Sequence, residues 1–509
     1  MKRLLYPFLL TLASLLFNYA RADLATSFWQ VGRPLVVQWA LLAVLVLPAY
    51  ALFRRWDSVG FVLLLFASVV YFQIAFFLEV LFVVLLTFGM YLIYARLTGT
   101  KRRVAEMLDW LTLASAVMIL FELAVVIHSL GDFPARAYLA ELTGADRPAP
   151  VSLTSAVPSE QPDIYYIVLD GYGREDILNS LYGFDNAGFI GALEERGFIV
   201  PSNNHSNYPR TVPSIVSTLN FNYLQTLAPG LDQTDYWWAL KPLLDDNAVA
   251  ASLQKIGYRT VSIATDFSDT NDLKTNVTYR PFPVMVSDFE MFLLESTPFE
   301  MVDPLLKPFA SIPTNASHQK IVEYDFSSLA SIASLPGSKF VFAHVISPHP
   351  PFIFAANGTA LNPRATLDLA DASNFPGSRL DYRQGYVQQV QFDNAEILSA
   401  IDRILSASRV PPIIILQADH GPGMLTNFGS AAQTCLSERF SPFAAYYLPG
   451  SASSAIPDDL TSVNLFRIVF DQYFGADLQL LPNSQYFYQR SGTSLDLIDV
   501  TGSVGTSCN

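Results

Sequence analysis

The stretch Asp163-Ile-Tyr-Tyr-Ile-Val-Leu-Asp-Gly-Tyr-Gly173 decides the fold. Its apolar residues have the length of one strand and do not alternate with polar residues, which is typical of a strand buried on both faces of a parallel sheet. The run leads directly into Asp170 and Gly171, a carboxylate followed by a turn residue. We therefore predict a first buried strand with a carboxylate at its carboxyl end.

Four further apolar runs of strand length follow, with helical patterns between them. The runs lie at 258–264, 339–346, 412–418 and 443–448, and amphipathic helices are expected at about 246–256, 380–407 and 461–474. This alternation predicts a mostly parallel sheet with helices on both faces. Ligands bind at the carboxyl ends of the strands in such sheets, so the polar residues there are the candidates for a functional site.

The chain before residue 130 is nearly continuous hydrophobic sequence, and 51% of all residues are hydrophobic while 15% are charged. A helix needs about 20 apolar residues to cross a bilayer. Five segments approach this length: 4–20, 35–53, 59–77, 79–95 and 109–130. The third and fourth nearly touch, so four spans with one long helix there remain the alternative to five.

The distribution of basic residues discriminates between these two topologies, because short cytoplasmic loops of membrane proteins are enriched in Lys and Arg. They cluster at Lys2–Arg3, at Arg54–Arg55 and at Arg96–Arg103. With five spans, all three basic clusters lie on the cytoplasmic side and the chain from about residue 130 onward lies outside. With four spans, the clusters fall on opposite sides of the membrane. We prefer five, which predicts a multi-pass protein of the cytoplasmic (inner) membrane with an extracytoplasmic domain. If the first segment is instead a cleaved signal peptide, the sidedness of the outer domain is unchanged.

The sequence thus predicts three parts: a transmembrane region of about five helices at 1–130, a linker rich in Ala and Pro at 131–162, and an outer domain at 163–509. The formal net charge of the chain is −14, which argues against nucleic acid as a partner. Both cysteines, Cys435 and Cys508, lie in the outer domain, where a disulfide between them is plausible; two free thiols are the alternative.

Two of the predicted strands end in groups that bind metals. The first leads into Asp170, and the strand at 412–418 leads into Asp419, His420 and Gly421. Carboxylate oxygens with an imidazole nitrogen suit Mn²⁺ or Zn²⁺, and Mg²⁺ is also compatible. An Asp-Gly pair alone is equally a common turn, so the prediction depends on the two strand ends together.

Between these strands, a polar turn at Ser206–Arg210 passes into a helix-like segment that starts near Thr211. Free N–H groups at a helix N-terminus favour an anion, and coordination to a metal can activate a hydroxyl there as a nucleophile. The alternative is that Thr211 only caps the helix. The neighbouring Arg210 is a weaker candidate for holding an anion, with an exposed surface arginine as the alternative.

A further candidate, His349, follows the strand predicted at 339–346, in Ser347-Pro-His-Pro-Pro-Phe352. An imidazole at a strand end can contact a phosphate oxygen or protonate a leaving group. His344 lies within the strand itself and is interpreted as a core residue. Of these two histidines, His349 is the one to which we assign a catalytic and substrate-binding role.

Together these motifs resemble those of the alkaline phosphatase/sulfatase superfamily, especially its lipoteichoic acid synthase-like branch of phosphoglycerol and phosphoethanolamine transferases. The resemblance covers about 160–475, and the matching elements are Val168–Gly171, Asn207–Thr211, Ser347–Phe352 and Ala418–Gly421. It implies a sulfatase-like fold in which four residues surround the metal and His349 contacts the phosphate. The four are Asp170, Thr211, Asp419 and His420.

One departure and two absences qualify what the resemblance implies about substrate, chemistry and metal. Asp170 stands where the synthase branch usually carries Glu, so the substrate is left open. No Cys-x-Pro-x-Arg motif lies near Thr211, which argues against the formylglycine that true sulfatases use. The chain has six histidines and none after His420, which favours one divalent metal over two. Manganese is our preferred ion, with zinc or magnesium as alternatives.

The leading functional hypothesis is a metal-dependent transferase that moves phosphoglycerol or phosphoethanolamine from a membrane phospholipid to an envelope glycan or lipid, through a phospho-threonine intermediate. One alternative is a phosphodiesterase or phosphatase, which differs in using water as the acceptor; a sulfuric ester hydrolase is less favoured. Another is a non-catalytic envelope assembly protein on the same fold. The filled ligand positions argue against that last alternative.

Overall fold

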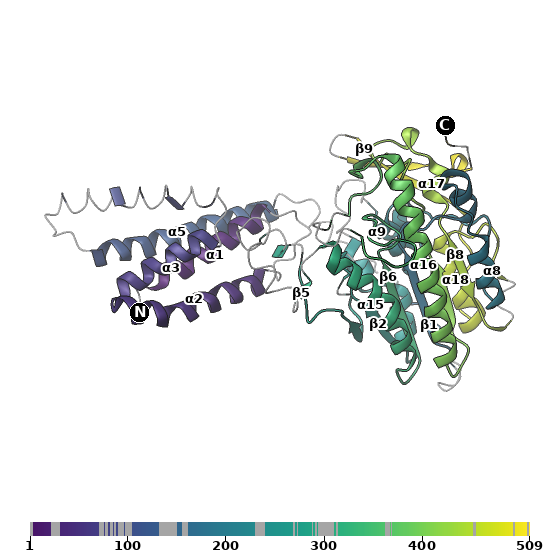
Figure 1. The fold of residues 1–509 in the computed structure, drawn as a ribbon, viewed down its shortest axis with the longest axis horizontal. Helices are drawn as coiled ribbons and strands as arrows, with labels where there is room; N and C mark the ends of the chain where they lie inside the picture. The colour runs from purple at the N-terminus through teal and green to yellow at the C-terminus, as the bar shows by residue number, and fades with distance from the viewer. Residues whose placement is uncertain are drawn as a thin grey trace. The chain divides into compact units, whose positions relative to one another are not determined.

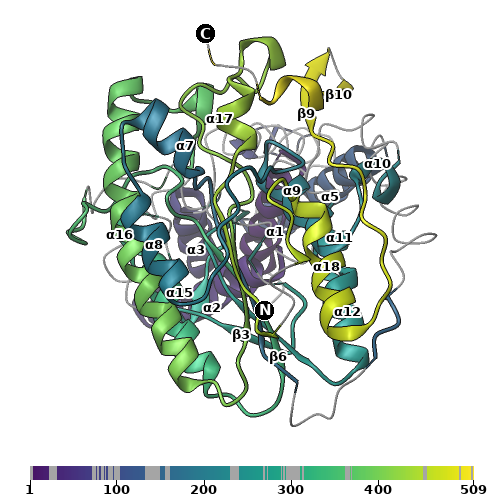
Figure 2. The ribbon, with the colours of Figure 1, turned by 90° about the vertical axis from the view of Figure 1, so that its right-hand side faces the viewer.

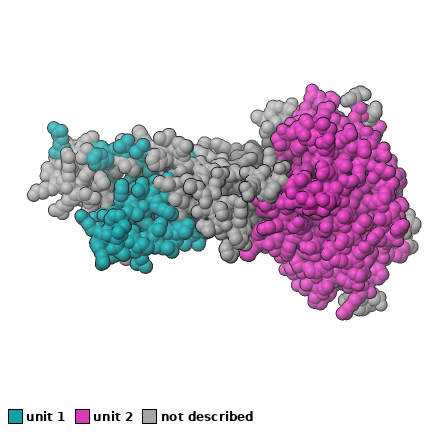
Figure 3. Space-filling model, in the orientation of Figure 1, with its two compact units in different colours: residues 1–136, 284–312 teal, residues 137–283, 313–509 magenta. Residues whose placement is uncertain are grey.

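The computed structural model describes most of the chain. The described residues are 4–21, 31–70, 104–131, 150–154, 161–229, 240–267, 270–271, 273–287, 314–361, 369–450, 455–491 and 494–505, with scattered single positions at 76–96, 289–311, 367 and 508. The chain forms two compact units, coloured in Figure 3. The first comprises Met1–Arg136 and Val284–Ile312, and the second comprises Ala137–Pro283 and Pro313–Asn509. The segment Val284–Ile312 thus belongs to the first unit, although the sequence places it within the predicted outer domain.

In the described part of the first unit, four helices lie side by side (Figure 1): α1 (Leu5–Arg21), α2 (Gly32–Phe53), α3 (Trp56–Val70) and α5 (Val104–Gly131). Two of them contain a stretch long and apolar enough to cross a membrane, namely Gly32–Phe53 and Asp109–Ile127; α1 and α3 are shorter apolar helices. The predicted span at 79–95 lies largely outside the described residues.

Large apolar side chains on two described helices of the first unit are exposed. Val44 and Leu47 of α2 are 69% and 75% exposed, and Leu120 and Phe121 of α5 are 65% and 61% exposed. A helix that is apolar on all sides is typical of a protein core or a membrane span, and these side chains are not in a core. The composition of α2 and α5 therefore fits a lipid environment.

The second unit is built on a six-stranded sheet with the order β3-β2-β6-β1-β7-β8. Every neighbouring pair is parallel except β7 with β8. The strands are β1 (Ile164–Leu169), β2 (Arg259–Ile263), β3 (Val277–Tyr279), β6 (Lys339–Val345), β7 (Ile413–Gln417) and β8 (Ala444–Tyr447). The predicted mostly parallel sheet is confirmed, and β1 lies inside it with all six residues buried.

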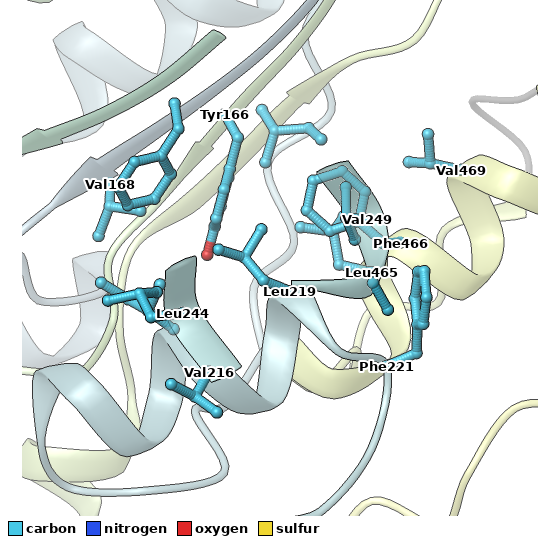
Figure 4. Packing of buried hydrophobic residues seen from close by; sticks show 14 of the residues in the cluster. Tyr166, Val168, Val216, Leu219, Phe221, Leu244, Val249, Leu465, Phe466 and Val469 are labelled. Carbon is cyan, nitrogen blue, oxygen red and sulfur yellow. The ribbon is translucent and has the colours of Figure 1, made fainter. Parts of the chain in front are cut away.

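Helices cover both faces of this sheet, as Figure 2 shows. On one face lie α9 (Thr211–Leu219), α12 (Ala248–Lys255) and α18 (Ser462–Phe474), and on the other lie α8 (Ala187–Glu195), α15 (Asn315–Ala333) and α16 (Arg379–Ala407). Alternate residues of β1 supply the two cores: Tyr166 and Val168 pack against the first layer, and Tyr165 and Ile167 against the second. Figure 4 shows Tyr166 and Val168 packed with side chains of α9, α12 and α18.

The remaining elements are short. They are α7 (Glu175–Ile177), the π-helical turn η4 (Leu178–Tyr182), α10 (Leu224–Leu227), α11 (Lys241–Asp245), β4 (Val284–Met285), β5 (Ala310–Ser311), α17 (Leu436–Phe440), β9 (Tyr486–Ser491), β10 (Ser494–Asp499) and the 3₁₀ turns η8 (Ala372–Asn374), η9 (Ala431–Gln433) and η11 (Thr501–Ser503). The antiparallel β9–β10 hairpin is separate from the main sheet.

The register of the central strands aligns the residues that follow them. Val168 of β1 pairs with His344 of β6 and with Gln417 of β7. Side chains of aligned residues in a parallel sheet point to the same face, and so do residues two positions apart along one strand. Asp170 and Asp419 therefore lie level with each other, on the face that α9 covers, and His344 lies two residues deeper on that face.

Candidate active site

The carboxylates of Asp170 and Asp419 meet at the carboxyl ends of β1 and β7. Both residues are 3% exposed. Asp419 Oδ1 accepts a hydrogen bond from the backbone N–H of Gly171 at 3.1 Å, which ties the two strand ends together. One ligand atom each from Asp170, Asp419 and His344 lie within 4.8 Å of one another. The predicted pairing of the two aspartates is thus present in the structure, and His344 joins them.

His420 directs one ring nitrogen into this cluster. Its Nδ1 lies 3.0 Å from the carbonyl oxygen of Gly421, which fixes Nδ1 as the protonated nitrogen and leaves a lone pair on Nε2. Nε2 lies 3.3 Å from Asp419 Oδ2 and 3.6 Å from Asp170 Oδ1. Burial lowers the pKa of His420, and the nearby Arg439 lowers it further. The imidazole is therefore held in the neutral form that binds metals.

His344 is the fourth side chain of this cluster, beside Asp170, Asp419 and His420. Its position within a strand predicts a core residue. Its Nδ1 lies 2.8 Å from Thr270 Oγ1, and its Nε2 lies 3.3 Å from Asp170 Oδ2. No sequence signal marks His344 as different from Phe340 and Phe342, which share its face of β6. The register between β6 and β1 is what brings its ring to Asp170.

This group of side chains fits a divalent cation. Among the described residues, Asp170 Oδ1, Asp419 Oδ2 and His344 Nε2 are buried atoms without a hydrogen-bond partner. Buried polar atoms are almost always satisfied, and two buried carboxylates side by side repel each other unless a positive charge lies between them. Burial would raise the pKa of Asp170, but His349, His344 and His420 lower it well below its ordinary range. The aspartate is thus ionised, as a metal ligand must be.

Thr211 is the first residue of α9. The preceding Arg210, in an extended conformation, occupies the N-cap position and makes no capping hydrogen bond with its side chain. Thr211 Oγ1 lies 3.4 Å from His420 Nε2, at the edge of this cluster of carboxylates and imidazoles. The hydroxyl therefore combines the positive end of a helix dipole with the proximity of the predicted metal site.

A pocket of about 310 Å³ borders this cluster: Asp170 and His420 line it, whereas Asp419 and His344 are not among its lining residues. Its lining residues are Asp170, Arg210, Thr211, Val212, Pro213, Phe267, Ile346, His349, Leu369, Ala370, Asp371, Asn374, His420, Phe428 and Arg439. The predicted candidates Asp170, Thr211, His349, His420 and Arg210 thus all line one cavity.

A buried ion pair that the sequence did not predict lies beside the cluster. Arg439, in α17, is 2% exposed, and its Nη1 donates to Asp371 Oδ2 at 2.8 Å. Its Nε donates to the carbonyl oxygen of Pro209 at 2.8 Å, and its Nη2 lies 3.2 Å from His420 Nε2. Burial raises the pKa of Asp371, but Arg439 and His349 outweigh this and bring it to about 2. The guanidinium is therefore fixed rigidly next to Thr211 and His420.

His349 lies near the same oxygen of Asp371 that accepts from Arg439. Its Nδ1 is 2.6 Å from the carbonyl oxygen of Pro350, and its Nε2 is 3.9 Å from Asp371 Oδ2. Burial would lower the pKa of His349, but the carboxylates of Asp170 and Asp371 reverse this, and the net shift is upward. His349 is thus suited to donate a proton into the pocket.

Arg210 lies in the pocket with its guanidinium over an aromatic ring. Its Cζ is 3.8 Å from the centroid of Phe428, and Arg439 Cζ is 5.1 Å from the same centroid. Burial lowers the pKa of Arg210 to about 10, and Arg439 contributes to this. Arg210 therefore remains charged at neutral pH, and the pocket contains two guanidinium groups.

Gly421, which follows the predicted metal ligands Asp419 and His420, has no space for a side chain. A Cβ atom there would lie 2.0 Å from the backbone oxygen of Glu438. We expect Gly421→Ala to lower the free energy of unfolding by about 1–3 kcal/mol or more, because backbone must move to relieve the overlap. Thermal denaturation measures this. Gly188→Ala is the matched control, because no atom lies within 4 Å of its added Cβ; equal melting temperatures for the two variants would contradict the prediction.

Glu438 is a buried acid whose ionisation should make the free energy of unfolding depend on pH. Glu438 accepts hydrogen bonds from Tyr182 Oη at 2.6 Å and from the Leu425 N–H at 2.8 Å, and burial raises its pKa from 4.5 to about 7. Because folding raises the pKa of this acid, the folded state holds its proton more tightly than the unfolded state does. The resulting stabilisation is complete below the unfolded pKa of 4.5 and is lost as the pH rises to about 7.

Glu438→Gln imitates the protonated acid at every pH. We therefore expect this variant to gain melting temperature over the wild type, with a larger gain at pH 7.5 than at pH 5. Melting curves of both proteins at the two pH values measure the difference. A gain that is the same at both pH values would show that Glu438 does not titrate in this range.

The C-terminus is joined to α17 by a disulfide between Cys435 and Cys508, which are 73 residues apart in sequence. Cys435 is the N-cap residue of α17, the helix that carries Glu438 and Arg439. The disulfide thus joins the C-terminal segment to the helix that carries Arg439, one partner of the buried ion pair.

Comparison with known proteins gives the following matches. A family model described as Sulfatase matches residues 162–473, more than half of the chain. No curated protein matches the chain. Similar solved structures include the C-terminal periplasmic domain of EptC from Escherichia coli in complex with zinc, with 11% identity over 70% of this chain and 98% of that one and a TM-score of 0.45.

Two other solved structures are phosphoethanolamine transferases by their descriptions. The C-terminal periplasmic domain of EptC from Campylobacter jejuni is 11% identical over 62% of this chain and 89% of that one, with a TM-score of 0.38. The integral membrane lipooligosaccharide phosphoethanolamine transferase A (EptA) from Neisseria meningitidis is 11% identical over 73% of this chain and 70% of that one, with a TM-score of 0.39.

Proposed function

Since this chain belongs to the sulfatase family of enzymes, we propose that it transfers a phosphate-linked group from a membrane lipid to an envelope glycan or lipid, through a phospho-threonine intermediate. The observation that carries this proposal is the position of Thr211. Its hydroxyl lies 3.4 Å from His420 Nε2, at the N-terminus of α9 and in the same pocket as His349 and Arg439. A threonine cannot be converted to formylglycine, which favours transfer of a phosphate-linked group over sulfate-ester hydrolysis.

The metal ligands in this proposal are Asp170, Thr211, Asp419 and His420, and the contacts of His344 add it to this set. We propose one divalent ion, with manganese preferred and zinc or magnesium as alternatives. A divalent ion bound there would neutralise charge on the phosphate and lower the pKa of the threonine hydroxyl. The unsatisfied atoms of Asp170, Asp419 and His344 support this assignment.

The first half-reaction uses two residues of the pocket. Thr211 Oγ1 attacks phosphorus and loses its proton to solvent, and the P–O bond to the lipid alcohol breaks. His349 donates its proton to that alcohol, which leaves as diacylglycerol. Arg439 and Arg210 are suited to hold the phosphate oxygens during this step, because guanidinium N–H groups match the geometry of phosphate.

The second half-reaction restores the enzyme. An acceptor hydroxyl gives its proton to His349 and attacks phosphorus, the bond from phosphorus to Thr211 breaks, and Thr211 regains a proton. The pocket also has apolar lining residues, including Val212, Pro213 and Leu369, which fit carbon-rich parts of the donor or acceptor. The apolar helices α2 and α5, which we propose anchor the chain in the cytoplasmic membrane, would give the outer domain access to lipid donors.

The full-length protein, purified in detergent and supplied with Mn²⁺ and phospholipid vesicles, tests this function. We expect release of diacylglycerol and a mass increase on the peptide that contains Thr211 when no acceptor is present. Release of the head-group phosphate into water, with no transfer to added glycolipid acceptors, would instead identify a phosphodiesterase. Absence of diacylglycerol with every phospholipid tried would refute the proposal.

A further inference from the structure

The imidazole of His344 has a buried hydroxyl as the partner of its Nδ1. Thr270 Oγ1 lies 2.8 Å from Nδ1, and Thr270 is 1% exposed. On the other side of the ring, Nε2 makes no hydrogen bond with the residues that the structure describes, although Asp170 Oδ2 is 3.3 Å away. A histidine that binds a metal through one ring nitrogen almost always donates the proton of its other ring nitrogen to a fixed partner. The contact between His344 and Thr270 has this arrangement.

A chain of hydroxyl groups indicates which ring nitrogen of His344 carries the proton. Thr270 Oγ1 lies 3.2 Å from Thr265 Oγ1, which lies 3.3 Å from the carbonyl oxygen of Phe267. If Nδ1 donates to Thr270, the Thr270 proton goes to Thr265 and the Thr265 proton goes to Phe267, so every donor has an acceptor. With the proton on Nε2, a buried N–H group would lack an acceptor in hydrogen-bond geometry, which is costly. The network thus favours a lone pair on Nε2, next to Asp170.

His420 has the same arrangement as His344. Its Nδ1 lies 3.0 Å from the carbonyl oxygen of Gly421, and its Nε2 lies 3.3 Å from Asp419 Oδ2. In both histidines an oxygen holds Nδ1, and Nε2 is left next to a buried carboxylate. The two differ in the source of that oxygen, which is the main chain for His420 and the side chain of Thr270 for His344. Only the second oxygen can be removed by a substitution.

The segment that carries Thr270 follows β2 and is held at two points. The N–H group of Thr270 donates to the carbonyl oxygen of Phe267 at 3.1 Å. Asp266 Oδ2 lies 2.7 Å from Nδ1 of His318, a fully buried residue of α15. The hydroxyl of Thr270 is therefore fixed in place by contacts that do not involve the cluster of carboxylates and imidazoles. Such preorganisation means that His344 needs little reordering to bind a metal.

From these contacts we infer that Thr270 is a positioning residue for the metal site: its hydroxyl accepts the Nδ1 proton of His344 and keeps Nε2 available, next to Asp170, as a metal ligand. This inference rests on the metal site of the proposed function and extends it to a residue outside the motifs that carry the family resemblance. Thr270 is not among the residues that line the pocket. Loss of its hydroxyl should therefore act on metal binding and not on substrate contacts.

Titration of the full-length protein with Mn²⁺, in the absence of substrate, tests the inference. Electron paramagnetic resonance follows the free Mn²⁺ and gives the dissociation constant. Thr270→Val keeps the shape of the side chain and removes the hydroxyl, and we expect its Kd to rise about 10-fold, the usual scale for loss of an outer partner of a ligand histidine. Thr270→Ser keeps the hydroxyl, so its Kd should stay within about threefold of the wild type. Thr270→Ala carries the same prediction as Thr270→Val and covers the case in which valine does not fit.

Thr260→Val is the matched control for loss of a buried hydroxyl. Thr260 lies near the start of β2, is also 1% exposed, and donates from Oγ1 to Asn276 Oδ1 at 3.1 Å. The control should melt at a lower temperature than the wild type and bind Mn²⁺ with wild-type affinity. It thus separates loss of positioning at the metal site from a general loss of stability.

A double-mutant cycle shows whether Thr270 acts through His344. His344→Ala removes the ligand itself and should weaken Mn²⁺ binding more than Thr270→Val does. In the His344→Ala background, Thr270→Val should have no further effect on Kd. Equal effects of Thr270→Val in both backgrounds would overturn the inference, and so would wild-type affinity in His344→Ala.

Failure of this inference and failure of the proposed function give different results. Mn²⁺ binding needs no substrate, so wild-type affinity in Thr270→Val, with diacylglycerol still released by the wild type, would remove Thr270 from the metal site and leave the transferase function standing. Absence of diacylglycerol release with every phospholipid tried, together with the expected pattern of Kd values, would count against the proposed function and leave the role of Thr270 intact.

Discussion

Replacing Thr211 by alanine is expected to reduce diacylglycerol release by at least about 10³-fold, which is the usual scale for loss of a covalent nucleophile. The change removes the hydroxyl that faces His420, together with the γ-methyl group. The helix should persist, because Arg210 holds the N-cap position and alanine favours helix more than threonine does. The variant should therefore keep its melting temperature and bind the metal when it is saturating, through the carboxylates of Asp170 and Asp419.

The control for this variant is Thr211→Ser, which restores a hydroxyl at the same backbone position. We expect it to recover activity to within about 10-fold of the wild type, since serine and threonine are chemically equivalent nucleophiles. Metal content and melting temperature, measured alongside the reaction rate, show whether each variant is intact. Wild-type turnover by Thr211→Ala would rule out the phospho-threonine intermediate.

Asp419→Asn should have a comparably large effect through loss of the metal. It keeps the shape of the side chain and an oxygen that can accept from the Gly171 N–H, but it removes one of the two buried negative charges. We expect the purified variant to hold less than about one-tenth of the wild-type metal content and to lose activity by about 10³-fold. Metal analysis of the two proteins, dialysed against the same buffer, measures the first effect.

The stability of the metal-free proteins supplies an independent readout for Asp419→Asn. In the absence of metal, the carboxylates of Asp170 and Asp419 repel each other, and the substitution relieves this repulsion. With chelator present, the variant should therefore melt no lower than the wild type, whereas added Mn²⁺ should raise the melting temperature of the wild type alone. A variant that is stabilised by Mn²⁺ as strongly as the wild type would show that Asp419 is not a ligand.

Much of the fold was predictable because its signals are local. The apolar runs that form β1, β2, β6, β7 and β8 are buried in the sheet, and burial on both faces demands continuous apolar sequence. Asp170 and Asp419 stood out because a charged residue directly after such a run must lie at the strand end. Parallel strands expose those ends at one edge, so the chemistry of the edge could be predicted from the sequence.

Other parts of the site have no local signature. His344 resembles its apolar neighbours in β6 until the register places it two residues below the level of Asp170. Arg439 and Asp371 form a buried pair from two segments far apart in the sequence, and each alone looks like an ordinary charged residue. The assignment of Val284–Ile312 to the helical unit likewise depends on contacts made across long sequence separations.

The sequence by itself determined the α/β fold, the strand ends that carry Asp170 and Asp419, and Thr211 as the candidate nucleophile, because periodicity and turn residues are encoded within short windows. Only the tertiary structure decided that His344 faces the same cluster and that Arg210 and Arg439 share the pocket with Thr211. Register and loop packing bring these groups together. Both depend on how distant segments fit against each other, which no short stretch of sequence specifies.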